Sequence, residues 1–256
     1  MVGGMMLRLG NRWLAVVIGG VLAACSYDTG NEPPTHTSQN QYGDEHTGQY
    51  HLGPVDFAET EWHNACAPGG GYREGLRGMT GLGGEYLAGV SNAFTDGGAV
   101  CDACILIETA EGRSIVARVV TYGATNEPGD IDVSPSVYAE LNQDEWPRTM
   151  TWQFADCPDT GTLRYEFQTG ANVWWTSFWV RNPRVPVVRV EVRSTNHAEW
   201  FELRRAGDGT LNDDGGFGEG PFTLRLTGMD DQVVEDTFDG FSPGEVIVSD
   251  QQFQSR

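Results

Sequence analysis

Short apolar runs separated by turn residues dominate the second half of the chain. Between residues 159 and 256, runs of β-branched and aromatic residues recur at regular spacing, and Gly, Asn, Asp and Pro separate them. This pattern is typical of a β-sandwich, in which each strand turns one face toward a shared core. The predicted strands are residues 163–168, 178–181, 187–192, 222–226 and 233–237.

The preceding part of the chain also predicts strands, together with one short helix. The runs 103–108 and 114–120 flank a short segment that contains Gly112, which favours a hairpin. Residues 134–141 predict a helix, with Ser134 as its N-cap and Pro135 in its first turn. We place a domain boundary near residue 157, so that residues 51–157 form one domain and residues 158–256 form the other.

The N-terminal residues predict an export signal over residues 1–24. Arg8 and Arg12 stand at or before the start of an apolar core, residues 13–21, that is too short to span a bilayer. The core ends in Leu-Ala-Ala-Cys at residues 22–25, which resembles a bacterial lipobox and implies lipidation of Cys25. Because Ser26 follows the cysteine, we expect an extracytoplasmic protein that is lipid-anchored at the outer membrane or cell surface. Ordinary secretion is the alternative.

Residues 25–50 are polar and lack a periodic apolar pattern, which predicts a disordered tether. His36, His46 and His51 fall in or beside this segment, and we expect them to be solvated and not to act as ligands. Such a tether would give the two domains reach from a membrane.

Charge narrows the classes of partner. The chain has 36 acidic and 16 basic residues, for a formal net charge of −20, and removal of the export signal would make it more negative still. Such a surface repels nucleic acid and anionic polymers, whereas a neutral polysaccharide meets no such barrier. We expect no nucleic-acid partner and contact with a membrane only through Cys25. Nothing in the sequence requires more than a monomer.

Four cysteines remain beyond the lipobox: Cys66, Cys101, Cys104 and Cys157. An even number in an oxidising compartment predicts two disulfides, and three pairings are possible. Among the possible pairings, a disulfide between Cys101 and Cys104 is the least favourable. The flanking strand patterns argue against a thioredoxin-like redox motif, and oxidation argues against a cysteine-bound metal. The segment Asn-Asp-Asp-Gly at residues 212–215 lacks the spacing of an EF-hand loop. We therefore expect neither a metal nor a cofactor.

Two acidic residues are candidates for chemistry. Asp130 and Asp132 precede the predicted helix, and strand alternation puts them on one face, with Ile131 on the other. A carboxyl group with a raised pKa can donate a proton to a glycosidic oxygen. Hydrolysis normally needs a second carboxylate across the sugar. The alternative is a turn followed by a helix cap.

Three tryptophans fall within six residues, and we call Trp174, Trp175 and Trp179 the tryptophan strip. Alternation places Trp175 and Trp179 on the strand face opposite Phe178 and Val180. Since Phe178 and Val180 suit a core, the tryptophans would be exposed and suited to stacking on sugar rings. The alternative is that they pack as core or interface aromatics.

These residues, in this order and spacing, resemble the expansins, and specifically the bacterial expansin-like proteins. The resemblance covers roughly residues 58–256. Its motifs lie at residues 60–64, 90–92, 97–104, 129–135, 174–175, 180–182, 186–187 and 233–237.

The resemblance implies an all-β protein: a six-stranded double-psi β-barrel followed by an immunoglobulin-like carbohydrate-binding module. It implies a non-hydrolytic function, the loosening of contacts between cellulose and matrix glucans in plant-type cell walls. It also implies the disulfide pairing Cys66–Cys101 and Cys104–Cys157, with Asp132 as the functional carboxylate. The polysaccharide contacts that we expect are Thr60, Trp62, Asn64, Tyr122, Asp130 and the tryptophan strip.

Some positions depart from the family pattern. Hydrolytic relatives carry a base Asp where this chain has Asn64, so we expect no hydrolysis. Thr121 or Tyr122 stands where many bacterial members have an Asp. The binding module of the family carries a third aromatic residue, but this chain has Asp208 or a neighbour near that place. Strand alternation puts Trp179 on the same face as Trp175, so we expect Trp179 to replace the missing aromatic.

Two alternative functions stay open. One is an enzyme, either a glucanase or a peptidoglycan lytic transglycosylase that uses Asp132 as an acid without a base; peptidoglycan would then be the partner. The other is a pure wall-adhesion module with an inactive barrel.

Overall fold

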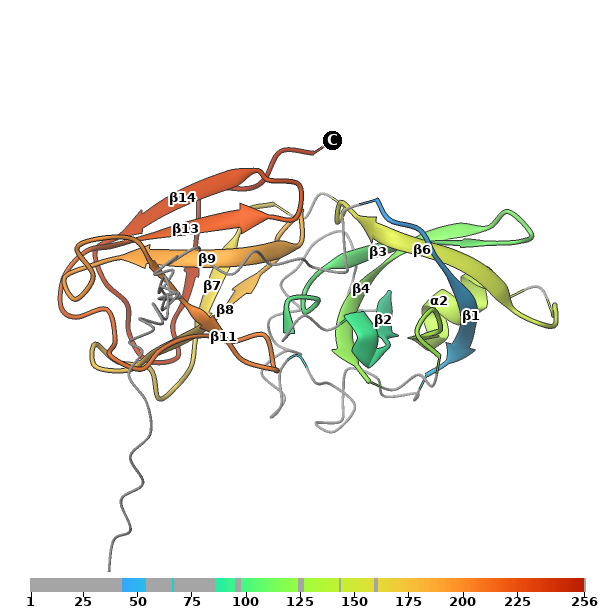
Figure 1. Cartoon of the computed structure of the whole chain (residues 1–256), viewed down its shortest axis with the longest axis horizontal. Coiled ribbons are helices and arrows are strands. Elements are labelled where there is room, and N and C mark those ends of the chain that lie inside the picture. Colours follow the sequence, from blue (N-terminus) through green and yellow to red (C-terminus); the bar gives the residue numbers. More distant parts are fainter. Residues whose placement is uncertain are drawn as a thin grey trace, which may run out of the picture. The chain divides into compact units, whose positions relative to one another are not determined.

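The computed structural model describes residues 43–53, 66, 86–94, 98–123, 127–142, 144–158 and 161–255. All of these residues belong to one compact unit within residues 38–256. The described residues lie mostly in strands and in the turns and loops that join them (Figure 1). The expected sites Cys25, Thr60, Trp62 and Asn64 lie outside the described residues, so their roles stay predictions.

The first part of this unit is a closed barrel of six strands in the order β1-β5-β2-β4-β3-β6 (Figure 1). The pairs β1–β5 and β2–β4 are parallel, and the other neighbours are antiparallel. The strands are β1 (His46–Leu52), β2 (Leu87–Val90), β3 (Cys104–Thr109), β4 (Ser114–Tyr122), β5 (Ile131–Val133) and β6 (Thr149–Ala155).

Alternating side chains fill the barrel. In β6, Met150, Trp152 and Phe154 are buried, while the residues between them are half-buried. The helix α2 (Pro135–Leu141) adds Val137 and Leu141 to the same core, and a 3-10 turn (Asn92–Phe94) adds Phe94. This period of two is what places one face of each strand inside the barrel.

The hairpin and helix that the sequence predicts are confirmed. Strands β3 and β4 pair antiparallel across a turn in which Gly112 has a φ of +82°, a conformation that suits glycine. Ser134 stands at the N-cap of α2, and Pro135 opens the helix. The Ser134 hydroxyl accepts a hydrogen bond from the Leu87 amide of β2 at 3.2 Å and makes no capping bond to the helix itself.

Strand β1 corrects the expected extent of the tether. Residues 46–50 were expected to be disordered, but they belong to a strand that pairs with β5 and β6 and closes the barrel. His46 is not a solvated linker residue, because its ring lies 4.6 Å from the ring of Phe94 and 4.4 Å from that of Trp152. Burial lowers the pKa of His46 accordingly.

The second part of the unit holds two further sheets, with strand orders β10-β9-β13-β14 and β11-β12-β8-β7-β15. Their common core takes buried side chains from both sheets, among them Tyr165, Phe178, Val190 and Leu224. The strands are β7 (Arg164–Phe167), β8 (Thr176–Arg181), β9 (Val187–Arg193), β10 (Phe201–Glu202), β11 (Arg204–Arg205), β12 (Leu211–Asp213), β13 (Phe222–Gly228), β14 (Val233–Phe238) and β15 (Val246–Val248).

The expected fold class, a six-stranded barrel followed by a β-sandwich, is therefore confirmed. All five strands predicted from the second half of the sequence are present, with ends shifted by at most two residues. The exact domain boundaries stay a prediction.

Candidate functional site

A backbone contact fixes the acidic segment against β1. A Cβ atom on Gly129 would lie 1.9 Å from the Thr47 carbonyl oxygen, and one on Gly48 would lie 2.2 Å from the Gly129 carbonyl oxygen. Only glycine permits two backbone segments to approach each other so closely. The buried Trp152 donates its indole N–H to the Gly129 carbonyl at 2.9 Å, which holds the residue before Asp130 in place.

Asp130 is bound to β1 through both carboxylate oxygens. Its Oδ1 accepts a hydrogen bond from the Gln49 amide at 2.8 Å, and its Oδ2 lies 3.1 Å from Nε2 of His51. The Asp130 side chain is 14% exposed, whereas the His51 side chain is 43% exposed. Asp130 therefore acts as an acceptor that joins β1 to the segment preceding β5.

Asp132 lies on the outward face of β5, as alternation predicted, because Ile131 and Val133 are buried in the barrel core. Its register partners are His51 on β1 and Gly89 on β2. Burial raises the pKa of Asp132; the His51 charge lowers it and the Asp130 charge raises it further. A carboxyl group that keeps its proton to higher pH can donate a hydrogen bond to a neutral oxygen.

Tyr122 ends β4 and contacts the sandwich. Its hydroxyl donates to the Gly207 carbonyl at 2.5 Å. Burial raises the pKa of Tyr122, and the Asp208 charge adds to the effect. The ring also packs against the cluster of Leu87, Cys101 and Val120. Tyr122 therefore lies where the barrel meets the sandwich, and its contact with polysaccharide stays a prediction.

The tryptophan strip is not uniformly exposed. Trp174 is 71% exposed, while Trp175 and Trp179 are half-buried. Trp174 precedes β8 in a turn that Asn172 stabilises, since the Asn172 Oδ1 accepts from the Trp174 amide at 2.9 Å. On the opposite side of this turn, Gly216 has a φ of +69°, and a Cβ there would lie 2.3 Å from the Val173 carbonyl oxygen.

Trp179 is an interface residue in addition to any role in binding. Its indole N–H donates to the Asp208 carbonyl at 3.0 Å, and its ring packs against the cluster that contains Cys66 and Cys101. Trp179 thus lies beside Asp208, where the family's third aromatic is expected. The guanidinium carbon of Arg181 lies 4.7 Å from the ring centroid, within cation–π range.

The expected exposure of this face of β8 is therefore wrong in part. Alternation holds, since Phe178 and Val180 are in the core. Ser177 and Arg181, on the same face as Trp175 and Trp179, are nevertheless 0% and 1% exposed. Barrel residues and the segment 206–210 cover the end of β8, a long-range effect that strand periodicity does not reveal.

Both disulfides have the pairing that the resemblance implied. Cys66 is bonded to Cys101 and Cys104 to Cys157. The Cys-x-x-Cys segment is therefore not a dithiol redox pair, because each cysteine has a different partner. All four residues are buried or nearly so.

His51 and Gly89 are the site residues that sequence reasoning missed. His51 was assigned to the vicinity of the tether, and Gly89 lay just before the motif at residues 90–92 and was given no role. Their place beside Asp132 follows from the pairing of β5 with β1 and β2, which joins residues more than 40 positions apart. A short polar strand gives no local indication of such pairing.

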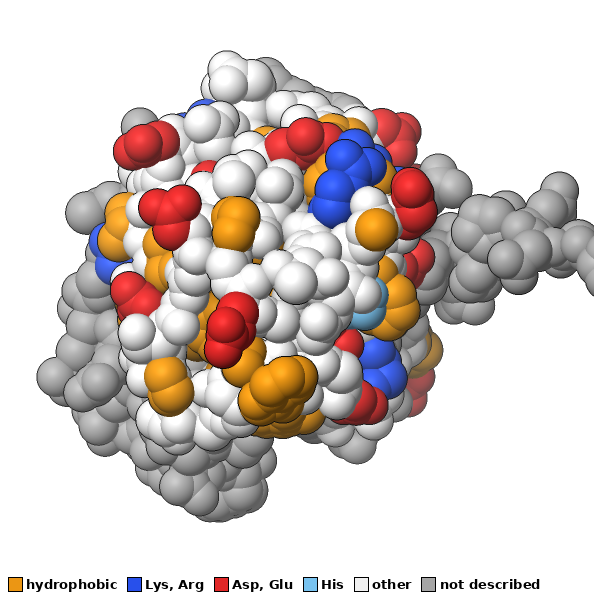
Figure 2. Space-filling model, turned by 90° about the vertical axis from the view of Figure 1, so that its left-hand side faces the viewer, with side chains coloured by type: hydrophobic (Ala, Val, Ile, Leu, Met, Phe, Trp, Pro, Cys, Tyr) orange, Lys and Arg blue, Asp and Glu red, His pale blue; other side chains and the backbone are white. Residues whose placement is uncertain are grey.

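One end of the sandwich carries charged and hydrophobic side chains together. Figure 2 looks onto this end and shows acidic side chains spread among hydrophobic ones, with basic side chains also present. In the part of the chain that the structure describes, no group of three or more His, Cys, Asp or Glu residues is placed to hold a metal ion. Among those same residues, no helix is long and apolar enough to cross a membrane.

No protein-family model matches the chain. Among curated proteins, it is similar to Expansin-YoaJ of Bacillus subtilis, with 25% identity over 132 residues, which cover 51% of this chain and 55% of that protein. It is also similar to Expansin-like protein 3 of Dictyostelium discoideum, with 22% identity over 58% of this chain and 46% of that protein. The chain thus spans about half the length of these two relatives.

Solved structures show the same fold. An expansin mutant of Clavibacter michiganensis in complex with cellohexaose aligns with a TM-score of 0.67 and 18% identity, over 83% of this chain and all of that one. The apo form of the Clavibacter expansin aligns with a TM-score of 0.63 and 20% identity, over 83% of this chain and 98% of that one. The resemblance to expansins is therefore confirmed in the sequences of curated relatives, and the chain has the fold of a solved expansin.

Proposed function

We propose that this protein binds cellulose and matrix glucans and loosens their contacts in plant-type cell walls without hydrolysing them. One observation supports this most strongly: the chain shares its fold, over 83% of its length, with an expansin that was crystallised with cellohexaose. The curated relatives are named as an expansin and an expansin-like protein.

The chemistry of the described surfaces suits a neutral glucan. Trp174 offers a largely exposed indole ring, and Asp132 offers a carboxyl group whose pKa is raised. Aromatic rings bind sugar rings through desolvation and contact area, which need no charge on the ligand. A net charge of −20 would oppose binding of a polyanion.

The arrangement of the carboxylates favours binding over hydrolysis. Asp130 and Asp132 are neighbours on one strand face and do not face each other across a sugar, as hydrolysis requires. Asp130 is also occupied by Gln49 and His51. Asn64, which stands where hydrolytic relatives have a base, is an amide and cannot accept a proton from water at neutral pH. Asp132 is left as the carboxyl group that can form a hydrogen bond with a glucan.

The location that we propose is extracytoplasmic, with a lipid anchor at Cys25. Two disulfides support an oxidising compartment. Labelling of cells with a radioactive fatty acid tests the anchor: the parent should incorporate label and the Cys25→Ala variant should not. Label in both proteins, or in neither, contradicts lipidation at Cys25.

A pull-down on insoluble cellulose and on peptidoglycan, with the supernatant assayed for released sugars and muropeptides, tests the function. We expect binding to cellulose with no soluble product. Binding to peptidoglycan with release of anhydro-muropeptides would instead establish a lytic transglycosylase. Replacement of Asp132 by Asn should abolish wall loosening in an extension assay; unchanged loosening would contradict a role for the barrel.

A further inference from the structure

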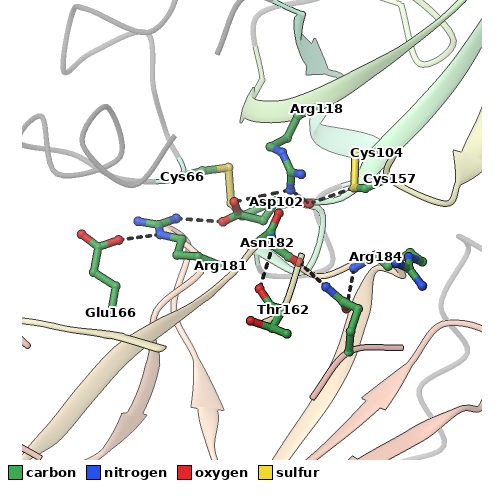
Figure 3. A network of polar contacts seen from close by, with 12 residues as sticks. Cys66, Asp102, Cys104, Arg118, Cys157, Thr162, Glu166, Arg181, Asn182 and Arg184 are labelled. Carbon is green, nitrogen blue, oxygen red and sulfur yellow. Dashed lines mark hydrogen bonds and ion pairs between the residues drawn. A yellow bond between two sulfur atoms is a disulfide. The ribbon is translucent and has the colours of Figure 1, made fainter. Parts of the chain in front are cut away.

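The barrel and the sandwich meet at a buried network of charges centred on Asp102 (Figure 3). Oδ2 of Asp102 lies 2.8 Å from Nη1 of Arg181, which belongs to β8 of the sandwich. Nη1 of Arg118, from β4 of the barrel, donates to the Asp102 carbonyl at 2.8 Å. Arg181 also contacts Glu166 on β7, with its Nε 2.7 Å from Oε2. The Asp102, Arg118 and Arg181 side chains are each 3% exposed or less.

Asp102 is itself held tightly to the barrel. In the sequence it lies between Cys101, which is bonded to Cys66, and Cys104, which is bonded to Cys157. Its amide donates to the Val119 carbonyl of β4 at 3.1 Å. Its φ of +66° is in the left-handed region. Buried ion pairs add little to stability relative to apolar packing, because both charges are desolvated. What a hydrogen-bonded pair of this kind supplies is a defined geometry between the groups it joins.

The two strands that Asp102 joins lie close to the candidate ligand contacts: β4 and β5, which carries Asp132, both pair with β2. Strand β4 ends at Tyr122, and β8 begins directly after Trp174 and Trp175. A second, indirect contact joins the same elements: Tyr122 of β4 donates to the Gly207 carbonyl, and the neighbouring Asp208 carbonyl accepts from Trp179 of β8. Contacts at two separate places therefore join β4 to the sandwich that contains β8.

We infer that Asp102 is a positioning residue that aligns the barrel surface at Asp132 with Trp174 of the sandwich, so that one glucan chain contacts both. This inference rests on the proposed function. When two binding surfaces are held rigidly in register, the second contact becomes intramolecular and the affinity for a long ligand exceeds that of either surface alone. Loss of the alignment lowers the affinity for long chains and leaves short ones unaffected.

The test compares cellotriose with cellohexaose by isothermal titration calorimetry on the full chain. Asp102→Asn removes the charge at nearly constant shape, and Asn tolerates a positive φ better than most residues. We expect unchanged affinity for cellotriose and a loss of about tenfold or more for cellohexaose. The matched control is Glu235→Gln, which makes the same chemical change at an exposed pair, 2.7 Å from Arg225 on the other sheet; both affinities should equal those of the parent.

A merely structural role would lower the unfolding temperature of Asp102→Asn and leave the ratio of the two affinities as in the parent, which would overturn the inference. Equal losses for both sugars would do the same. If Asp102→Asn does not fold, Arg181→Lys keeps the charge, loses the paired geometry and is measured in the same way. A parent that binds cellulose but prefers neither sugar contradicts the inference alone. A parent that binds neither cellulose nor the oligosaccharides contradicts the proposed function as well.

Discussion

Nε2 of His51 lies 3.1 Å from a carboxylate oxygen of Asp130, while His51 is at the same time the register partner of Asp132 on the neighbouring strand. One imidazole therefore lies between two carboxylates of unequal environment. Its charge opposes the rise in pKa that burial and Asp130 impose on Asp132. The protonation of Asp132 consequently depends on both neighbours, with opposite signs.

The first prediction concerns the direction in which each neighbour shifts the pKa of Asp132. His51→Gln should raise the pKa of Asp132, because it removes the charge that lowers it, and Asp130→Asn should lower the pKa, because it removes a like charge. Titration of the Asp132 carboxyl carbon by NMR measures both. His197→Gln is the control, since His197 forms its own 2.7 Å pair with Asp213 in the sandwich and should leave Asp132 unaffected. Shifts of the same sign in the first two variants would contradict this account.

The second prediction concerns stability as a function of pH. Because the folded-state pKa of Asp132 is raised above its ordinary value of 3.8, the folded chain holds this proton more tightly than the unfolded chain. The resulting stabilisation is complete below the ordinary pKa and is lost as the pH rises through the folded-state pKa.

Asp132→Asn, which cannot ionise, should therefore be more stable than the parent at neutral pH. The difference in melting temperature should shrink as the pH falls through the raised pKa toward 3.8. Melting curves recorded between about pH 3.5 and 8 measure it, a range that spans the ordinary pKa values of Asp and His. A difference that stays constant across this range would indicate that Asp132 is not desolvated in the folded state.

The third prediction separates the members of the tryptophan strip. Trp174→Ala should weaken binding to cellulose by roughly 1–3 kcal/mol with little change in stability, since the ring is 71% exposed. Trp179→Ala should lower the melting temperature as well, because it removes a hydrogen bond to Asp208 and a contact with the Cys101 cluster. Binding isotherms on insoluble cellulose and thermal melts measure the two effects.

A matched control for Trp174 exists in the barrel. Trp146 is 76% exposed and its ring lies 5.3 Å from the Arg148 guanidinium carbon, outside the tryptophan strip. Trp146→Ala should bind cellulose as the parent does. If it loses as much affinity as Trp174→Ala, exposed indole rings bind cellulose without specificity. If the Trp175→Ala and Trp179→Ala variants both bind cellulose as the parent does, these two residues of the strip take no part in cellulose binding.

Local pattern predicted much of this fold, and long-range pairing explains what it missed. Phe178 and Val180 were placed in the core correctly because the period of two is a local property of a strand. Strand β1 was missed because its sequence is polar, and its pairing depends on a contact of Gly48 with Gly129 that is remote in sequence. The burial of Trp179 was missed for a similar reason, since residues of the barrel cover it.

The last prediction concerns the disulfide at the junction of the two domains. Cys104 and Cys157 are 53 residues apart, and cross-linking a loop of that length restricts the unfolded chain enough to stabilise the fold by ~4 kcal/mol. The double variant Cys104→Ala with Cys157→Ala should lose about that much in guanidinium unfolding. Removal of Cys66–Cys101, with a separation of 35, should cost nearly the same, because the entropy depends only logarithmically on loop length. A loss of stability below about 1 kcal/mol would show that the unfolded chain is already restricted by other contacts.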